Sequence, residues 1–432
     1  MPRFNVWHRR SSQTVILLFT AMASKPALSA MTLQDALRQA TRHSQALPAQ
    51  NYSAEAARER AIAADTLPDP VLRLAVENVP VDGPVRFSLD AERMTMRSIG
   101  LSQTYTRAAK RDAKQERYRQ EEQVANARWH AQLSNLQTET AKAWLSLHFQ
   151  HQLLHWQEQR REQVARQSEA METAYRSGRA SQHEWWSVQS QLLQLDEQLL
   201  AQRTQVENAE MRLQRWIGVE QPLVLADTMP NISALPFDLQ QLRLAVDDYP
   251  EIIAMNAQVQ LSKAEADVAK ADTQSDWSWS VMYGIRDSDF GDMLSVGVSI
   301  PLQWNQENRQ QRDYAAKLSE ANQRRAETEE KRRLLLLDVQ QKWNAWQSAL
   351  ARQKQYQQQL LPLAESRAEA TQTAFASNRA SMAAVFEARR AVLDTHLNET
   401  SLAWQAALLW AELYFLFPES EMVTAPIQSH AE

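Results

Sequence analysis

Thr173-Ala-Tyr-Arg-Ser-Gly-Arg-Ala-Ser181 recurs later in the chain as Thr373-Ala-Phe-Ala-Ser-Asn-Arg-Ala-Ser381, at an offset of 373 − 173 = 200 residues. Six of the nine positions are identical. A second match, Ser98-Ile-Gly-Leu-Ser102 against Ser295-Val-Gly-Val-Ser299, has an offset of 197. Because two matches in the same order have nearly the same offset, we predict two copies of one long unit rather than many short repeats.

This repeat divides the sequence into five segments. They are a signal peptide (1–30), the first repeat (31–218), a linker (219–238), the second repeat (239–418) and a C-terminal tail (419–432). Each repeat is expected to contain long helices and one strand pair, at about 70–104 and about 277–301. The linker contains three prolines, which favour an irregular segment on the outside of the molecule.

The first 30 residues have the pattern of an export signal. Arg3, Arg9 and Arg10 precede an apolar run at 15–19, and small residues before Met31 offer a cleavage site. The run is too short to cross a bilayer as a helix, with a retained N-terminal anchor as the alternative. No later stretch of the sequence is long and apolar enough for a transmembrane helix, so any membrane insertion has to use strands.

Composition restricts both the fold and the function. Only 7 glycines occur in 432 residues, among stretches rich in Ala, Gln, Leu, Glu and Arg, and this predicts very long helices. Cysteine is absent, which excludes disulfides, thiolate metal sites and cysteine nucleophiles. A net charge of −5 lacks the basic field that nucleic-acid binding requires, so no nucleic-acid partner is expected.

Apolar residues in the long segments recur at alternating steps of four and three, as in a coiled-coil seam. The first such series is Trp129, Leu133, Leu136, Thr140, Ala143 and Leu147. No proline occurs between Val85 and Gln221, so one helix of about 70 residues and roughly 100 Å is expected before the turn at Gly178. Pro362 should kink the last long hairpin. The sequence therefore predicts duplicated long helical hairpins.

The second strand pair alternates between apolar and small polar residues. One face carries Trp277, Trp279, Val281, Tyr283, Val296 and Val298, and the other face carries mainly serine and glycine. A strand half-buried in a soluble sandwich has the same period and remains an alternative. Aromatic residues on the outside and small polar residues on the enclosed side favour a lipid-facing strand. Because four strands are too few to close a barrel and lipid does not tolerate an open edge, we predict a homotrimer with 12 membrane strands.

Catalytic and metal-binding motifs are scarce. The sequence has no Walker loop, His-Glu-x-x-His or Gly-x-Ser-x-Gly motif, so neither enzyme activity nor a cofactor is expected. His148, His151 and His155 share one helical face and are weak candidates for Zn²⁺ or Cu²⁺ ligands. Three imidazoles along one helix converge poorly, so a solvated or interhelical stripe is the preferred interpretation and no metal site is predicted.

These features resemble the TolC family of outer-membrane efflux proteins over essentially the whole mature chain. The resemblance is carried by Tyr175-x-x-Gly178, by Phe375-x-x-Asn378 and by the helix ending in Leu213-Gln-Arg-Trp-Ile-Gly218. A narrower resemblance, to the branch that serves heavy-metal pumps of the resistance-nodulation-division type, is carried by these motifs: Leu67-Pro-Asp-Pro70, Asn78-Val-Pro80, Met94-Thr-Met-Arg-Ser-Ile-Gly-Leu-Ser-Gln103 and Lys110-Arg111.

The resemblance implies a mainly α fold with a small membrane β part, in which a trimeric 12-stranded β-barrel in the outer membrane continues into a periplasmic α-barrel. It implies a passive duct in a tripartite efflux pump, with heavy-metal cations as the expected cargo. The helical tips would contact a periplasmic adaptor (membrane fusion) protein and an inner-membrane resistance-nodulation-division transporter. The tip residues are Tyr175, Gly178, Arg179, Phe375, Asn378 and Arg379.

Family members close the periplasmic end with rings of acidic residues, which lie nine and twelve residues beyond the aromatic residue of the second tip motif. The matching residues here are Ala384 and Glu387, so one acid is present and one is missing. Three copies of Glu387 would attract cations, although an ordinary solvated glutamate is the alternative. Glu184 occupies the position of Ala384 in the first repeat and is the second gate candidate.

Two other protein classes have some of these features. A periplasmic adaptor also has a long hairpin, but it needs glycine-rich β domains, which 7 glycines and a duplicated layout do not favour. A structural coiled-coil protein of the cell envelope would show the same seams without membrane-facing strands. The hairpin from Trp277 to Ile300 distinguishes the duct from such a coiled-coil protein.

Overall fold

The computed structural model of the chain describes residues 30–287 and 289–418. The predicted signal peptide up to residue 29 and the predicted tail from residue 419 lie outside these described residues, so both stay predictions.

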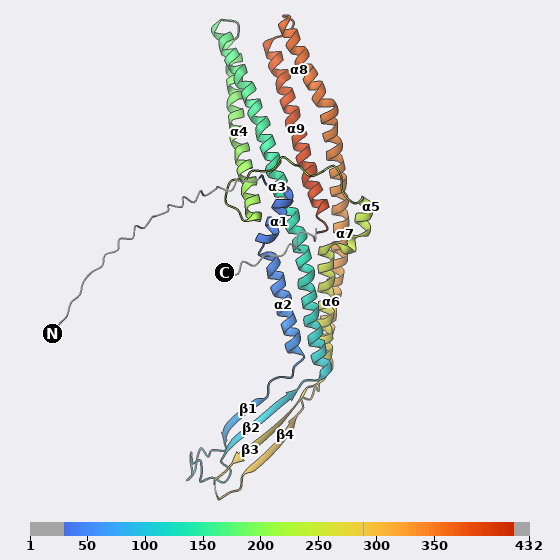
Figure 1. Cartoon of the computed structure of the whole chain (residues 1–432). Helices are drawn as coiled ribbons and strands as arrows, with labels where there is room; N and C mark the ends of the chain where they lie inside the picture. The colour runs from blue at the N-terminus through green and yellow to red at the C-terminus, as the bar shows by residue number, and fades with distance from the viewer. Residues whose placement is uncertain (1–29, 288, 419–432) are drawn as a thin grey trace, which may run out of the picture.

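Helices and strands follow the same order in the two halves of the chain (Figure 1). The first half contains α1 (Leu33–His43), α2 (Ala46–Ala64), β1 (Val71–Glu77), β2 (Met96–Tyr105), α3 (Ala108–Arg176) and α4 (Gln182–Ile217). The second contains α5 (Leu239–Leu244), η1 (Val246–Asp248), α6 (Pro250–Ala271), β3 (Trp277–Ile285), β4 (Met293–Ser299), η2 (Gln306–Asn308), α7 (Gln310–Gln355), η3 (Tyr356–Leu360), α8 (Leu361–Ala376) and α9 (Met382–Tyr414). The prediction of a mainly α fold built on duplicated helical hairpins is confirmed.

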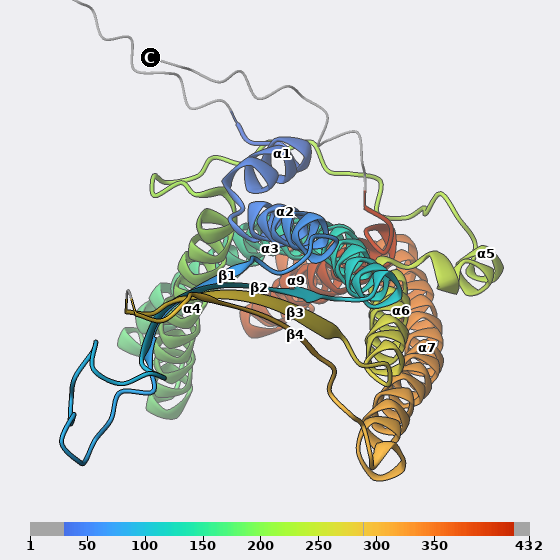
Figure 2. The same cartoon turned by 90° about the horizontal axis from the view of Figure 1, so that it is seen from below.

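The long helices lie side by side in one curved layer. Towards the sheet α3 contacts α2 and α6, and α6 contacts α7, whereas at the other end α3 contacts α4 and α9. Figure 2 shows the layer as an arc, with α1, the linker 219–238 and α5 on its convex side. Within the described chain, no helix combines the length and the apolar character that crossing a membrane requires.

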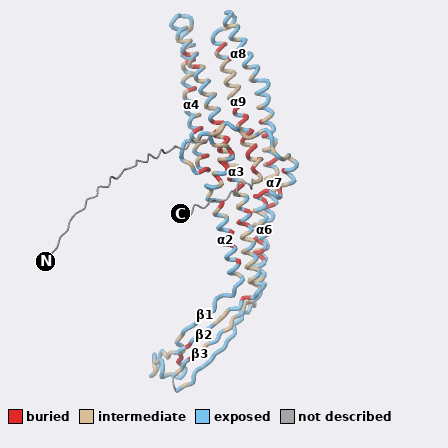
Figure 3. The backbone as a smooth tube through the Cα atoms, viewed as in Figure 1, coloured by how far each residue is buried: buried red, intermediate tan, exposed pale blue. Residues whose placement is uncertain are grey.

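Helix α3 organises both ends of the layer because nothing in its sequence interrupts it. Its 69 residues contain neither proline nor glycine, so the hydrogen-bonded ladder extends over roughly 100 Å. Buried residues gather at the middle of the molecule, where α4, α6 and α9 reach α3 (Figure 3). Trp144, Leu213, Ile252 and Phe415 are fully buried there. The core therefore lies at the middle of the molecule, between two mostly exposed ends. We call this middle region the waist.

Three indole N–H groups fasten the outer segments to this waist through main-chain atoms. The indole of Trp144 donates to the carbonyl of Met31 at 3.1 Å. Trp346 donates to the carbonyl of Ile232 at 3.1 Å, and Trp410 to that of Ala234 at 3.0 Å. Because a buried indole N–H needs an acceptor, these bonds fix both the N-terminal segment and the linker on the helices.

A proline next to a wide turn interrupts the second hairpin. Residues Tyr356–Leu360 (η3) form a π-helical segment directly before α8, and Pro362 is the second residue of that helix. Proline has no N–H and its ring crowds the carbonyl four residues earlier, so a wider turn accommodates it. This π segment has no counterpart within α3, and the kink expected at Pro362 stays a prediction.

The four strands form a single antiparallel sheet in the order β1-β2-β3-β4. Each half of the chain contributes one hairpin, and β2 pairs with β3 along Arg97–Tyr105 to join them. The sheet extends beyond the end of the helical layer (Figure 1). At the junction, Lys110 lies 2.7 Å from Asp272 and 3.0 Å from Asp276, so an ion-pair cluster connects the first turn of α3 to the segment that enters β3.

Gly218 provides a test of the packing between α1 and α4. Its φ of 70° closes α4, and a Cβ added there would clash with the ring of His43. Gly178 has the same φ but open space around it. We expect Gly178→Ala to cost about 1–2 kcal/mol of unfolding free energy, from the left-handed backbone alone. Gly218→Ala should cost clearly more, because the His43 ring must also move. Urea unfolding of the two variants in detergent measures the difference, and equal losses would contradict it.

Candidate functional site

Four parts of the molecule carry the candidate functional residues. They are an apolar face of the sheet, the two helical tips at the opposite end, a charged cavity at the waist, and a stripe of histidines on α3. The charged cavity is the part that was not predicted from the sequence.

The apolar sheet face is continuous across all four strands. The register places Trp279 opposite Val298, and Val281 opposite Val296. Val281 also lies opposite Leu101, which in turn pairs with Leu72. These side chains share one face because directly paired residues point to the same side of a sheet. The predicted residues Trp277, Trp279, Val281, Tyr283, Val296 and Val298 therefore belong to a larger apolar surface than the second hairpin alone.

This apolar sheet face is uncovered in the single chain. Val296 is 71% exposed and Val298 is 63% exposed. The opposite face carries small residues such as Ser280 and Gly297, which pair with each other. A strand from a soluble sandwich would have its apolar side packed against a second sheet, but the described residues form one sheet only. An exposed apolar surface of this kind marks contact with a membrane or another protein.

The two helical tips are built alike, as the repeat requires. The N–H of Arg179 donates to the carbonyl of Ala174 at 2.8 Å, and that of Arg379 to Ala374 at 2.8 Å. Gly178 has a φ of 70° and Asn378 has a φ of 57°, so both turns use the left-handed region that glycine and asparagine tolerate. The predicted tip residues lie at these turns, at the end of the molecule far from the sheet (Figure 1).

The tips differ in their aromatic residues, which the sequence analysis missed. Tyr175 stacks on Trp185 with ring centroids 5.5 Å apart and an interplanar angle of 3°. The ring centroid of Trp186 lies 4.6 Å from that of Trp185, with the two rings tilted by 43°. Trp186 is 55% exposed and enlarges this aromatic cluster. The positions 200 residues later hold Val385 and Phe386. Comparing the two repeats position by position would have shown this asymmetry.

The two gate candidates occupy different local environments. The carboxylate of Glu184 accepts from both the N–H and the hydroxyl of Ser181, at 2.7 Å each, and completes a capping box for α4. These backbone and side-chain hydrogen bonds hold the pKa of Glu184 below its usual range. Glu387 lies 3.8 Å from Arg367, and both side chains are exposed. The structure places them on separate hairpins and gives Glu184 a capping role.

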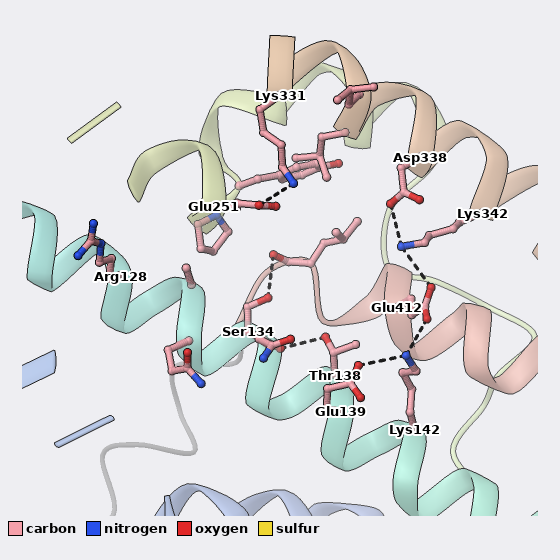
Figure 4. Close-up of a pocket in the computed structure, with 18 of the residues that line it drawn as sticks. Arg128, Ser134, Thr138, Glu139, Lys142, Glu251, Lys331, Asp338, Lys342 and Glu412 are labelled. Atoms are coloured by element: carbon pink, nitrogen blue, oxygen red, sulfur yellow. Dashed lines mark hydrogen bonds and ion pairs between the residues drawn. The ribbon is translucent and has the colours of Figure 1, made fainter. Parts of the chain in front are cut away.

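A chain of ion pairs lines a cavity of about 770 Å³ at the waist (Figure 4). Glu412 of α9 contacts Lys142 of α3 at 2.9 Å and Lys342 of α7 at 3.2 Å. Lys142 also contacts Glu139 at 3.1 Å, and Lys342 contacts Asp338 at 2.8 Å. One carboxylate thus bridges two lysines from helices that do not neighbour each other at this level. We call Glu412, Lys142 and Lys342 together the Glu412 bridge.

Burial and ion pairing shift the pKa values of these three side chains in opposite directions. Burial raises the pKa of Glu412, but the hydrogen bonds and charges of Lys142 and Lys342 outweigh it, and the pKa lies below its usual range. Burial lowers the pKa of each lysine, and the acidic partners outweigh it, so both lysine pKa values are raised. Lys142 and Lys342 stand 200 residues apart, at equivalent positions of the two repeats. The 200-residue offset between the two lysines is the sequence feature from which this cluster could have been predicted.

The predicted histidine stripe lies between α3, the linker and α9. His148 is half-buried and stacks on Trp144, with ring centroids 5.7 Å apart. Burial lowers the pKa of His148. His151 and His155 are exposed on the same wall. Within the described chain, no three His, Cys, Asp or Glu side chains converge as a ready-made metal site.

Comparisons with known proteins identify solved structures that share this architecture. No family model and no curated protein matches the sequence. Among solved structures, CusC, described as forming a transmembrane channel, is similar with a TM-score of 0.73 and 16% identity, over 90% of this chain and 92% of its own. The outer-membrane channel OprN is similar with a TM-score of 0.72 and 15% identity, over 89% of each chain. The chain has the fold of an outer-membrane channel.

The same fold extends to a third structure. The outer-membrane protein VceC from Vibrio cholerae is similar with a TM-score of 0.70 and 16% identity, over 89% of this chain and 95% of its own. Because these identities are low, the likeness establishes the outer-membrane channel fold and not the cargo or the partners. The fold that the TolC resemblance implied for a single chain, long helical hairpins with four strands, is confirmed.

Proposed function

We propose that this chain is one subunit of a trimeric outer-membrane channel of the TolC family, the passive exit duct of a tripartite efflux pump. The observation that carries the proposal is the uncovered apolar sheet face. Its strands need lipid on one side, yet four of them leave two unpaired edges, which a bilayer does not tolerate. Three copies would supply 12 strands, enough to close a barrel around an aqueous lumen.

The helical layer supports the same arrangement. It is curved, and the linker and α5 lie on its convex side (Figure 2). Three such arcs would enclose a second barrel coaxial with the first and extend it through the periplasm. No step of the transport would be chemical in this chain, because the pump behind the duct would move the substrate.

The tips would meet a periplasmic adaptor and, directly or through it, an inner-membrane transporter of the resistance-nodulation-division type. The exposed arginines Arg179 and Arg379 and the aromatic residue Tyr175 are suited to such contacts, because interfaces are enriched in these residue types. Heavy-metal cations are the proposed cargo. That choice is supported by the sequence motifs of the heavy-metal branch and by Glu387, whose exposed carboxylates would form an acidic ring in a trimer.

The direct test is the cellular fraction of the mature protein together with its mass in detergent. We expect a trimer recovered from the outer membrane. A monomer or dimer that is soluble in the periplasm would contradict the proposal and favour an adaptor or a structural coiled-coil protein.

A charge reversal at the tips should separate docking from assembly. We expect Arg179→Glu combined with Arg379→Glu to abolish export-dependent metal resistance, because both exposed cations would face the adaptor. The trimer should still form, since these side chains are remote from the sheet. Arg166→Glu, on the exposed stem of α3, is the matched control and should retain resistance. Full resistance in the double variant would argue against docking through these arginines.

A further inference from the structure

A second cavity, of about 630 Å³, lies between α3, the linker and α9. Its wall includes His148, His151 and His155 from α3, Asp227 from the linker, and Glu399 and Thr400 from α9. The linker crosses the convex side of the helical layer (Figure 2), so this cavity lies on that side. The channel function proposed above does not account for a cavity lined by imidazoles and carboxylates there.

His151 and His155 have the geometry of a helix-borne chelating pair. They stand four residues apart on α3, so their side chains lie one above the other on the same face. Both are exposed at the cavity wall. Within the described chain neither ring nitrogen of either residue takes part in a hydrogen bond or an ion pair. Two imidazoles at this spacing form half of a tetrahedral zinc site in known helical motifs.

His148 is committed to other contacts. Its Nε2 lies 2.9 Å from the side-chain amide nitrogen of Gln152, which is a donor, so the imidazole accepts there. The ring also stacks on Trp144. These contacts fix the orientation of His148 and leave His151 and His155 as the pair with unused nitrogens.

Of the two carboxylates that line the cavity, one has hydrogen-bond partners and the other has none. Glu399 accepts from the side-chain amides of Gln353 at 3.0 Å and Gln357 at 2.6 Å, which hold it in place. Asp227 is exposed and, within the described chain, forms no hydrogen bond or ion pair. Within the described residues, no three ligands converge in this conformation. Asp227 lines the same cavity and its charge acts on His148, so it is the exposed, unbonded carboxylate that a bound ion would have to draw in.

We propose that this cavity binds one divalent transition-metal ion, of the class Zn²⁺, Cu²⁺ or Ni²⁺, through His151 and His155. Asp227 of the linker is the third ligand and water completes the coordination, as imidazole and carboxylate ligands allow for these ions. The ion would tie the linker to α3 from the convex side, apart from the lumen. The proposal does not depend on metal being the cargo.

The test is a titration of the purified mature protein, without a histidine tag and stripped with a chelator, with Zn²⁺ in detergent. We expect one calorimetric site per chain, absent from the double variant His151→Ala/His155→Ala. His130→Ala/His183→Ala is the matched control, because it removes two exposed histidines that lie apart from the cavity, and it should bind as the unmodified protein does. Asp227→Asn should weaken binding by about tenfold or more.

A second readout identifies the ligands directly. With Cu²⁺, electron paramagnetic resonance should show two coordinated imidazole nitrogens in the unmodified protein and in the His130/His183 control. Unchanged Zn²⁺ affinity in His151→Ala/His155→Ala would overturn the proposal, as would equal loss in both double variants. Because all four histidines are exposed, trimer mass and unfolding midpoint should stay the same throughout, which separates loss of the site from loss of the fold.

Discussion

Val296→Lys is expected to remove the protein from the outer membrane. The side chain lies in the middle of β4, on the apolar sheet face, and is 71% exposed in the single chain. A lysine on the lipid side of a membrane strand costs about 2–4 kcal/mol near the bilayer midplane, and a trimer would carry three copies. We expect heat-resistant trimer to be lost from the outer-membrane fraction, as measured by gel mobility without boiling.

The neighbouring residue supplies the control. Ser295 is also exposed, but its side chain points to the opposite face of the same strand. Ser295→Lys should therefore insert and assemble, since a cation on that side would meet water in the lumen. If both variants assembled equally well, or if only Ser295→Lys failed, the assignment of the lipid side would be wrong.

Glu412→Ala is expected to destabilise the waist. It would leave Lys142 and Lys342 facing each other without the carboxylate between them. Removing one partner of a fully buried pair costs about 3–5 kcal/mol. The side chains of the Glu412 bridge keep 23–30% exposure, so solvent screening reduces the expected loss of unfolding free energy to about 1–3 kcal/mol. Urea unfolding of the detergent-solubilised protein measures it.

Two comparisons make this result specific. Glu387→Ala breaks an exposed pair and should change the unfolding free energy by less than about 0.5 kcal/mol. The triple variant Lys142→Met/Lys342→Met/Glu412→Leu should recover most of the loss, because it removes all three charges of the bridge. The two carboxylates that it leaves without a lysine, Glu139 and Asp338, are 40% and 46% exposed and stay hydrated. Since the pKa of Glu412 is lowered on folding, its contribution is present above the unfolded value of 4.5 and is lost as the pH falls through the folded value. The difference between Glu412→Ala and the unmodified protein should therefore shrink in acid.

Much of the fold could be predicted because its signals are local or repeated. The 200-residue offset identified the hairpins, and the alternation from Trp277 onward identified both the strand and its apolar side. The uninterrupted run from Ala108 to Arg176 made α3 one helix. Local signals located η3 less well: Pro362 indicated a disturbance, but a π turn before it depends on how the neighbouring helices constrain the backbone.

The candidate site likewise contains parts that local sequence signals predict and parts that depend on how distant segments pack. The tips were predictable because each is a short turn with its own motif. The Glu412 bridge was not, because it joins residues from three helices whose approach depends on where α9 ends between α3 and α7. Asp227 reaches the histidine cavity only because the linker folds back over α3, and an irregular segment gives no periodic signal of its path.

The three indole bonds at the waist have a consequence for how this protein can evolve. Trp346 and Trp410 contact the linker through the carbonyls of Ile232 and Ala234, and Trp144 contacts the carbonyl of Met31. Every amino acid carries a carbonyl, so substitutions at these three acceptor positions leave the bonds intact. Related chains should therefore keep the tryptophans and the spacing between the acceptors while the linker sequence drifts. An alignment by sequence alone would lose its register there first, even where the path of the backbone is unchanged.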